Sequence, residues 1–167
     1  VFLDNINEYS RQEKFKMFEN LLNLYFLNTS LGNRSLVREE FDMLKLQLKH
    51  NAFTPDENSW INNMQFRNIL IMGIDIKEYK WTEKFIHGYS KYLRPSQRDN
   101  IVLYSKALLE YRRGNPGKAL EYSVKVKYDT FIFKRDLKLI LLRLFYEEGL
   151  FEQARYFYDT SKKYTKK

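Results

Sequence analysis

The sequence predicts an all-α protein: a right-handed α-solenoid of antiparallel helical hairpins, with about eight helices in a single helical-repeat domain spanning residues 1–167. Only six Gly and three Pro occur, too few for the frequent turns of an all-β fold. Apolar and aromatic side chains recur at steps of three and four residues along most of the chain, which is the period of amphipathic helices. A hinge-like segment also occurs twice, 35 residues apart, which indicates a helical repeat.

The first hairpin is expected within residues 10–51, as a degenerate repeat. Ser10 and Glu13, in the stretch SRQE, form a predicted capping box, in which each side chain reaches the backbone amide of the other residue. The helix should end near NTSLGN, where Gly32 can take left-handed backbone angles. Ser35 is the expected N-cap of the next helix. The apolar stripe of the first helix consists of Phe15, Phe18, Leu21, Leu22, Tyr25 and Phe26, and that of the second of Leu36, Phe41, Leu44 and Leu48.

The second hairpin is expected within residues 54–95, again as a degenerate repeat. The stretch TPDE predicts a second capping box at Thr54, with Pro55 at the first helical position, where its missing N–H costs nothing. The helix that starts there should end at about residues 73–75, and the next helix should cover about residues 77–93. It should end there because Pro95 pushes the residue before it out of helical angles.

The last two hairpins, residues 97–130 and 131–167, are the clearest repeats. Ser96 is expected to begin a helix, and a second helix should follow the turn GNP. Short connections between amphipathic helices make neighbouring helices antiparallel. The final pair of helices is expected at about residues 131–148 and 151–164.

The two hinges of the repeat are YRRGNPGKALEY, residues 111–122, and YEEGLFEQARYF, residues 146–157. At a shift of 35 residues, glycine falls on glycine, where a left-handed turn is needed, and alanine falls on alanine, where two helices approach closely. Further upstream, Tyr79, Thr82 and Ile86 occupy the same roles with a slightly longer hinge. The matched pairs are Leu109 with Leu144, Tyr111 with Tyr146, Gly114 with Gly149, Ala119 with Ala154, and Tyr122 with Phe157.

The last two hairpins resemble the tetratricopeptide repeat, whose period is about 34 residues. The final hairpin follows the motif most closely, whereas its neighbour has Glu110 and Pro116 at aromatic positions, and the opening Trp of the motif is absent from both. The stretch from WTEKFI to LFYEEG is also similar to an uncharacterised family of tetratricopeptide-like proteins from Bacteroidetes. That similarity implies an architecture but no activity. The motif residues of the final hairpin are Leu141, Leu142, Phe145, Gly149, Phe151, Ala154, Tyr158 and Ser161.

Few residues are suited to catalysis or to metal binding. Cys is absent, which excludes thiolate metal sites and fits a reducing cytoplasm, the compartment we predict. His50 and His87 lie outside any metal-ligand spacing, and we expect His50 to suit the end of its helix as a cation. The longest apolar run, LILLRLF, is too short to cross a membrane. We predict no enzymatic activity, no cofactor, no metal and no membrane insertion; an enzyme whose polar residues meet only in three dimensions is a competing interpretation.

The predicted functional site is a groove that binds a partner. The resemblance to tetratricopeptide arrays implies that the first helix of each hairpin lines a concave face. A groove of Tyr and Arg suits an extended or helical peptide of a protein partner, and an acidic peptide in particular. The competing interpretation is that some of these residues are packed or solvated. The predicted groove residues are Arg67, Tyr104, Leu108, Tyr111, Arg112, Arg143 and Tyr146, with Ile71, Leu139 and Glu147 beside them.

The main alternative function is that of a nucleic-acid-associated adaptor. Lys and Arg outnumber Asp and Glu by 29 to 21, which gives a net charge of +8, and single-stranded nucleic acid stacks on aromatic side chains in positive grooves. Against this alternative, Tyr and Phe at helical spacing are more often core residues, and the sequence has no nucleic-acid module signature. The basic C-terminal stretch SKKYTKK is expected to be a solvated end of the chain.

Overall fold

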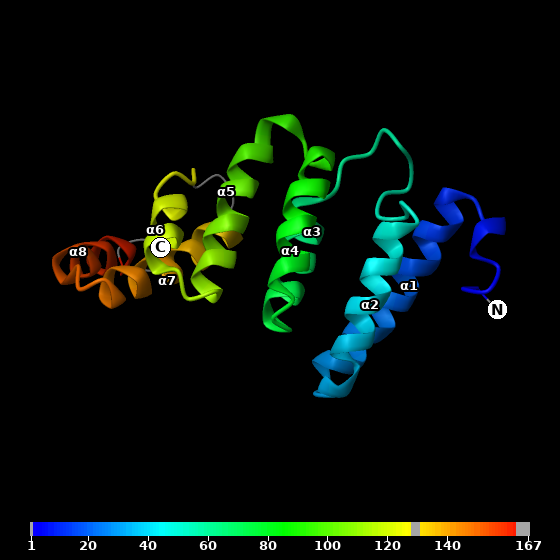
Figure 1. Ribbon diagram of the computed structural model, residues 1–167, viewed down its shortest axis with the longest axis horizontal. Coiled ribbons are helices and arrows are strands. Elements are labelled where there is room, and N and C mark those ends of the chain that lie inside the picture. Colours follow the sequence, from blue (N-terminus) through cyan, green and yellow to red (C-terminus); the bar gives the residue numbers. More distant parts are fainter. Residues whose placement is uncertain (1, 128–130, 163–167) are drawn as a thin grey trace. The chain divides into compact units, whose positions relative to one another are not determined.

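The computed structural model describes residues 2–127 and 131–162, and all of its regular structure in those ranges is helical (Figure 1). This confirms the all-α prediction and the predicted number of helices. The basic stretch predicted at the C-terminus lies outside the described residues, apart from the backbone of its first two positions. The α-helices are α1 (Arg11–Ser30), α2 (Val37–Lys49), α3 (Asn63–Asp75), α4 (Tyr79–Tyr89), α5 (Pro95–Arg112), α6 (Pro116–Ser123), α7 (Phe131–Glu147) and α8 (Phe151–Lys162), and the 3₁₀ turns are Ile6–Glu8, Arg34–Leu36 and Ser90–Tyr92.

The chain divides into two compact units. The first unit is Val1–Ile76 and contains α1 to α3; the second unit is Lys77–Lys167 and contains α4 to α8. In the first unit, α1 packs against α2, and α2 packs against α3. In the second unit, each helix packs against the next one, and α5 also packs against α7. The prediction of one continuous repeat domain stays a prediction.

The start of α1 is closed by the predicted capping box. The Ser10 hydroxyl accepts from the Glu13 amide at 3.3 Å, and the Glu13 carboxylate accepts from the Ser10 amide at 2.8 Å. The backbone N–H groups of the first helical turn have no acceptor within the helix. These two bonds therefore satisfy two donors that would otherwise be unpaired. The helix ends at the predicted turn, where Gly32 has a φ of +98°.

The fully buried phenylalanines of the first unit are Phe18, Phe41, Phe53 and Phe66.

The predicted helix start at Thr54 is wrong, because residues 51–62 form a loop. α3 begins after this loop, where the Asn62 side chain accepts from the amide two residues later at 2.8 Å. Thr54 is instead bound by α1: Arg11 donates to the Thr54 hydroxyl at 2.7 Å and to its carbonyl at 3.2 Å. The Asp56 side chain also accepts from the amide two residues later at 2.8 Å, and such local bonds compete with helix formation.

Two further helix starts differ from the prediction by one or two residues. α2 begins at Val37, and the Ser35 hydroxyl donates to the side chain of Asn33 at 2.6 Å instead of capping the helix. α5 begins at Pro95, whose fixed φ angle suits the first helical position, so the expected start at Ser96 is one residue late. In these places local bonding and proline geometry set the boundary.

The two hinges identified from the repeat have the same backbone geometry. Gly114 has a φ of +79° and Gly149 a φ of +71°, and each glycine amide donates to the carbonyl three residues earlier at 3.1 Å. The next amide, of Asn115 or Leu150, donates to the carbonyl five residues earlier, at 2.9 Å or 2.7 Å. This is the glycine-terminated helix end that the repeat predicts. The paired residues Leu109 and Leu144 are buried, and so are Ala119 and Ala154.

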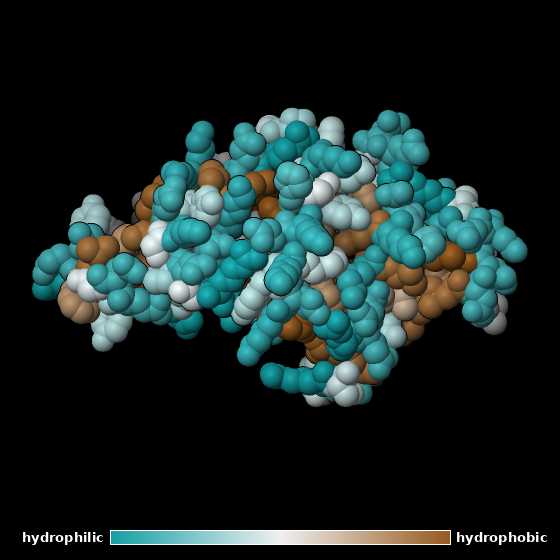
Figure 2. Space-filling model, viewed as in Figure 1, coloured by the Kyte–Doolittle hydropathy of each residue, from teal (hydrophilic) through white to brown (hydrophobic). Residues whose placement is uncertain are grey.

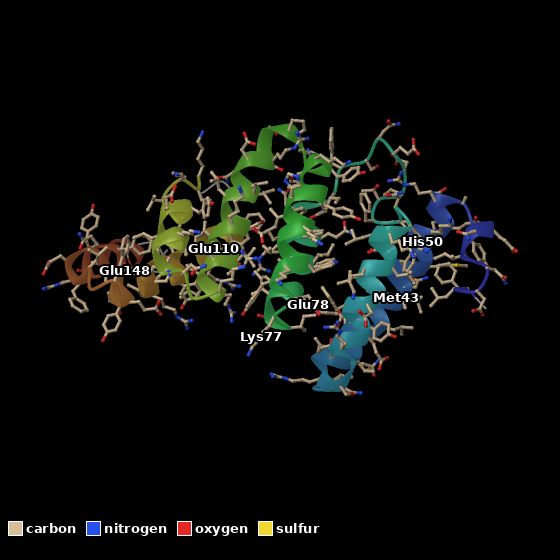
Figure 3. All side chains as sticks on the ribbon, in the orientation of Figure 1. Met43, His50, Lys77, Glu78, Glu110 and Glu148 are labelled. Carbon is tan, nitrogen blue, oxygen red and sulfur yellow. The ribbon has the colours of Figure 1, made fainter. Side chains whose placement is uncertain are left out.

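A third hinge, at the start of the second unit, has a positive φ angle at a residue other than glycine. Lys77 has a φ of +63° and lies next to Glu78 at the start of α4 (Figure 3). Thr82 is fully buried, and its amide donates to the Glu78 carbonyl at 2.9 Å. The Ala119 amide makes the equivalent bond to Asn115 at 3.0 Å. Thr82 therefore has the role of the small residue that the sequence pattern predicted.

Candidate partner-binding groove

The first unit has an open groove of about 700 Å³ bounded by α1, α2 and α3. The walls of the groove are helical. Figure 2 shows apolar residues at the surface of α1 and α2. The α1 residues that line the groove extend from Phe15 to Thr29. At 1.5 Å per residue, this stretch is roughly 21 Å long, enough for about four turns of a bound helix. The main apolar lining residues are Phe15, Leu22, Phe26, Leu44, Ile69 and Met72.

One end of the groove holds a buried carboxyl group. Glu40 is only 6% exposed although it lines the groove, and the Thr29 hydroxyl of α1 donates to it at 3.3 Å. Burial raises the pKa of Glu40, because removal from water disfavours the charged form, while the Thr29 hydroxyl acts in the opposite direction. This end of the groove therefore presents a weakly solvated acceptor group to any bound segment.

The other end holds a buried amide that is half satisfied. Gln47, seven residues after Glu40 on α2, is 0% exposed, and its Nε2 donates to Glu19 Oε1 on α1 at 3.4 Å. Among the residues that the structure describes, no donor is bonded to Gln47 Oε1. A buried acceptor without a partner costs free energy, on the order of 1–3 kcal/mol, and a bound donor would recover it. The sequence analysis did not identify Glu40 and Gln47 as site residues. The one feature of the sequence that indicates their burial is their position beside the apolar stripe of α2.

Charge is divided unevenly between the two units. The first unit has eight Lys and Arg against ten Asp and Glu, a net charge of −2. The second unit has 21 Lys and Arg against 11 Asp and Glu, a net charge of +10. Three acidic residues line the groove, and Arg67 is the one basic residue among the lining side chains that the structure describes; the acidic ones are Glu19, Glu40 and Asp75.

The predicted groove residues fall into three places. Arg67 and Ile71 line the groove of the first unit. All the other predicted residues belong to the second unit. Tyr104 and Leu108 are 1% and 8% exposed, so they are core residues and offer no surface to a partner.

Tyr104 is buried because its position on α5 faces α7. Its hydroxyl donates to Asp136 of α7 at 2.8 Å, and its ring packs edge-on against Phe133 with 4.7 Å between centroids. The phenol therefore satisfies its polar end inside the core, as buried tyrosines usually do. The prediction that Tyr104 lines a groove does not agree with this arrangement.

The remaining predicted residues form an exposed surface on α5 and α7, two helices that pack against each other. Arg112 and Arg143 are exposed, Tyr146 is 68% exposed, and Tyr111 is half-buried. The Tyr111 hydroxyl lies 3.5 Å from a Glu147 carboxylate oxygen, at the limit of hydrogen bonding. Leu139 is exposed on the same helix as Arg143. This surface is basic and aromatic, in contrast to the groove of the first unit.

A polar network in the second unit explains why Glu110 stands at an aromatic position of the repeat. Glu110 accepts from Arg113 at 2.8 Å and from Asn115 at 2.7 Å, and Figure 3 labels it on α5. Arg113 also donates to Glu83 of α4 at 2.7 Å, and this bond is the main cause of the lowered pKa of Glu83. The network closes the hinge after α5 and joins it to α4. At the equivalent position of the last hairpin, Phe145 instead packs edge-on against Phe157.

The two histidines lie in different surroundings. Burial, with Lys14 and Lys49 nearby, lowers the pKa of His50, so the expected role as a cation at the helix end is not supported. His87 is exposed and lines a smaller recess of about 400 Å³ between α4, α5 and α6. In the ranges that the structure describes, no group of three His, Asp or Glu side chains could hold a metal ion.

Comparison with family models, curated proteins and solved structures finds no match for this chain. The resemblance to tetratricopeptide repeats, and to the Bacteroidetes family, therefore stays a prediction. None of the helices, over the residues described, is long and apolar enough to span a bilayer.

Proposed function

We propose that this chain is a non-catalytic interaction module that binds a helical or extended segment of a protein partner. The observation that carries this proposal is the open, largely apolar groove of about 700 Å³ between α1, α2 and α3. Grooves between helices accept amphipathic helices, whose apolar side chains enter at helical spacing. The length of the α1 wall, roughly 21 Å, fits such a segment.

Helical-repeat architecture, with hairpins stacked as a right-handed α-solenoid, belongs to the same proposal. Two features support it: the equivalent hinges at Gly114 and Gly149, and the packing of α5 against both α6 and α7. In the first unit, Thr29 pairs with Glu40 while Glu19 pairs with Gln47, as expected for two helices that run in opposite directions. Solenoids of this kind expose broad surfaces that favour binding over catalysis.

The proposal is tested by blocking the groove. Peptides of about 14 residues, designed as amphipathic helices, are selected for binding to the full chain by phage display and then measured by fluorescence anisotropy. Leu22→Trp places an indole inside the groove, whereas Leu24→Trp places the same group on an exposed part of α1 outside it. We expect Leu22→Trp to weaken binding at least tenfold and Leu24→Trp to leave it unchanged. Equal binding by both variants would show that the groove is not the site.

The uneven charge supports a second candidate function, a nucleic-acid-associated adaptor that uses the second unit. Its net charge is +10, and Tyr146, Tyr156 and Tyr158 are each about half exposed or more. Basic surfaces with exposed aromatic side chains bind single strands by phosphate contacts and stacking. Binding of a labelled oligothymidylate should then weaken steeply with salt and depend on Arg143 and Tyr146. Salt-independent or undetectable binding would exclude this function.

A further inference from the structure

We infer that the groove of the first unit selects helical segments that carry a lysine or arginine among their apolar residues. This inference rests on the proposed function and specifies the chemistry of its partner. It reverses the expectation of an acidic peptide, which the sequence suggested from Arg67 together with Arg112 and Arg143. Of these three, Arg67 alone lines this groove.

The first argument is the unsatisfied acceptor at Gln47. This side chain is 0% exposed and lines the groove, and within the described part of the chain its Oε1 has no hydrogen-bond partner. The orientation of the amide follows from Glu19, since its Nε2 donates to a Glu19 carboxyl oxygen at 3.4 Å and that oxygen is an acceptor. A ligand that brings a donor to this acceptor gains a hydrogen bond, whereas an apolar ligand leaves the acceptor unpaired, as it is in the chain alone.

The second argument is the charge around that acceptor. A neutral donor would satisfy Gln47, but Glu19 lies beside it, and Glu40 and Asp75 also line the groove. A lysine ammonium has three N–H donors and can bond the Gln47 and Glu19 oxygens together. Hydrogen bonds between ionised groups are about twice as strong as neutral ones. A carboxylate in the same place would be repelled by Glu19 and would leave Gln47 without a donor.

The net charge of +8 does not oppose a basic ligand at this site. The positive excess lies entirely in the second unit, and the first unit has a net charge of −2. At physiological salt, exposed charges act over about 8 Å, so residues of the groove itself govern the ligand's local environment. Among the described residues that line the groove, Arg67 is the one base against three acids.

The test is a selection from a phage library of amphipathic helices of about 14 residues. In each peptide one position of the apolar face is replaced by Lys, Arg, Gln, Met or Glu, and the library covers every position of that face. The library is selected against the full chain, against Gln47→Leu and Glu19→Gln, and against the control Glu39→Gln. Glu39 is exposed on α2 and does not line the groove, so its variant removes the same charge elsewhere. Circular dichroism shows whether each variant is folded; Gln47→Met replaces Gln47→Leu if the latter is not.

With the wild-type chain we expect Lys and Arg to exceed Met roughly tenfold at one position of the selected peptides, since a charged hydrogen bond is worth about that factor. The preference should vanish in Gln47→Leu, fall in Glu19→Gln and persist in Glu39→Gln. Selected peptides that compete at the groove but show no preference for Lys or Arg, or prefer Glu, would overturn the inference and leave the proposed function intact. Peptides that bind equally well to Leu22→Trp would overturn both.

Discussion

Arg113, just after α5, donates to Glu83 of α4 with 2.7 Å between Nη2 and Oε2. The same guanidinium donates to Glu110 at 2.8 Å and to the Tyr79 carbonyl at 3.2 Å. It is 21% exposed, whereas Glu83 is 64% exposed, so solvent weakens the ion pair with Glu83 more than the bonds to the other two acceptors. One side chain thus joins two consecutive helices and the hinge between α5 and α6.

Replacing Arg113 with Met should lower the free energy of unfolding by about 1–2 kcal/mol, because three acceptors lose a charged donor. Arg155→Met, on the exposed surface of α8, is the matched control and should change stability by less than about 0.5 kcal/mol. Urea denaturation followed by circular dichroism measures both. Equal effects would mean that the network around Arg113 contributes nothing specific.

Tyr104 and Tyr111 should differ strongly although both are tyrosines of α5. Tyr104→Phe removes the bond to Asp136 and should cost about 1 kcal/mol, and Tyr104→Ala should cost about 3–5 kcal/mol because it also empties a buried site. Tyr111→Phe loses only a 3.5 Å contact at a half-buried position and should be close to neutral. Thermal unfolding of the four proteins, wild type included, measures the differences. A neutral Tyr104→Ala would contradict the burial of this ring in the core.

Gly114→Ala and Gly149→Ala should each destabilise the protein by about 1 kcal/mol. Both glycines have positive φ angles, and a Cβ atom added to either one would meet no neighbouring atom within 4 Å, so the cost is conformational and not steric. Gly88→Ala, inside α4 and equally unobstructed, should instead stabilise the protein by about 0.5–1 kcal/mol. Chemical denaturation gives the three values. Loss of stability in all three variants would argue against a special role for the hinges.

Glu40 should make stability depend on pH. Because burial raises the pKa of Glu40 above its ordinary value of 4.5, the folded protein binds this proton more tightly than the unfolded chain. The free energy of unfolding should therefore fall, relative to Glu40→Gln, as pH rises through 4.5 and on through the higher folded-state pKa. Denaturation of both proteins at several values between about pH 4 and pH 7 measures this difference. Glu39→Gln, with an exposed carboxylate, should track the wild type; a constant difference between wild type and Glu40→Gln would contradict the prediction.

Features set by neighbours in sequence were predictable. The capping box of Ser10 and Glu13, and the left-handed glycines at Gly114 and Gly149, depend on residues within one helical turn. The capping box at Thr54 failed because its hydroxyl and carbonyl are bound by Arg11, 43 residues earlier in the chain. No local pattern contains that information.

The candidate site was harder to predict than the fold for a related reason. Gln47 and Glu40 are polar residues of an amphipathic helix, and their burial follows from how α1 and α3 lie against α2. Tyr104 and Tyr111 look equivalent in the sequence, as two aromatic residues of one helix. Tyr111 continues the stripe of Ile101, Tyr104 and Leu108, but it lies in the last turn of α5 and is only half-buried, whereas Tyr104 lies deeper in the helix and packs against α7.

The isoelectric point near 9.5 describes the whole chain, but its two units carry net charges of opposite sign. Separated from the rest, residues 1–76 would migrate as an anion at neutral pH, and residues 77–167 as a strong cation. Chromatography on the intact protein will report mainly the cationic part. A search for ligands that begins with polyanions will thus sample one end of the chain and overlook the other.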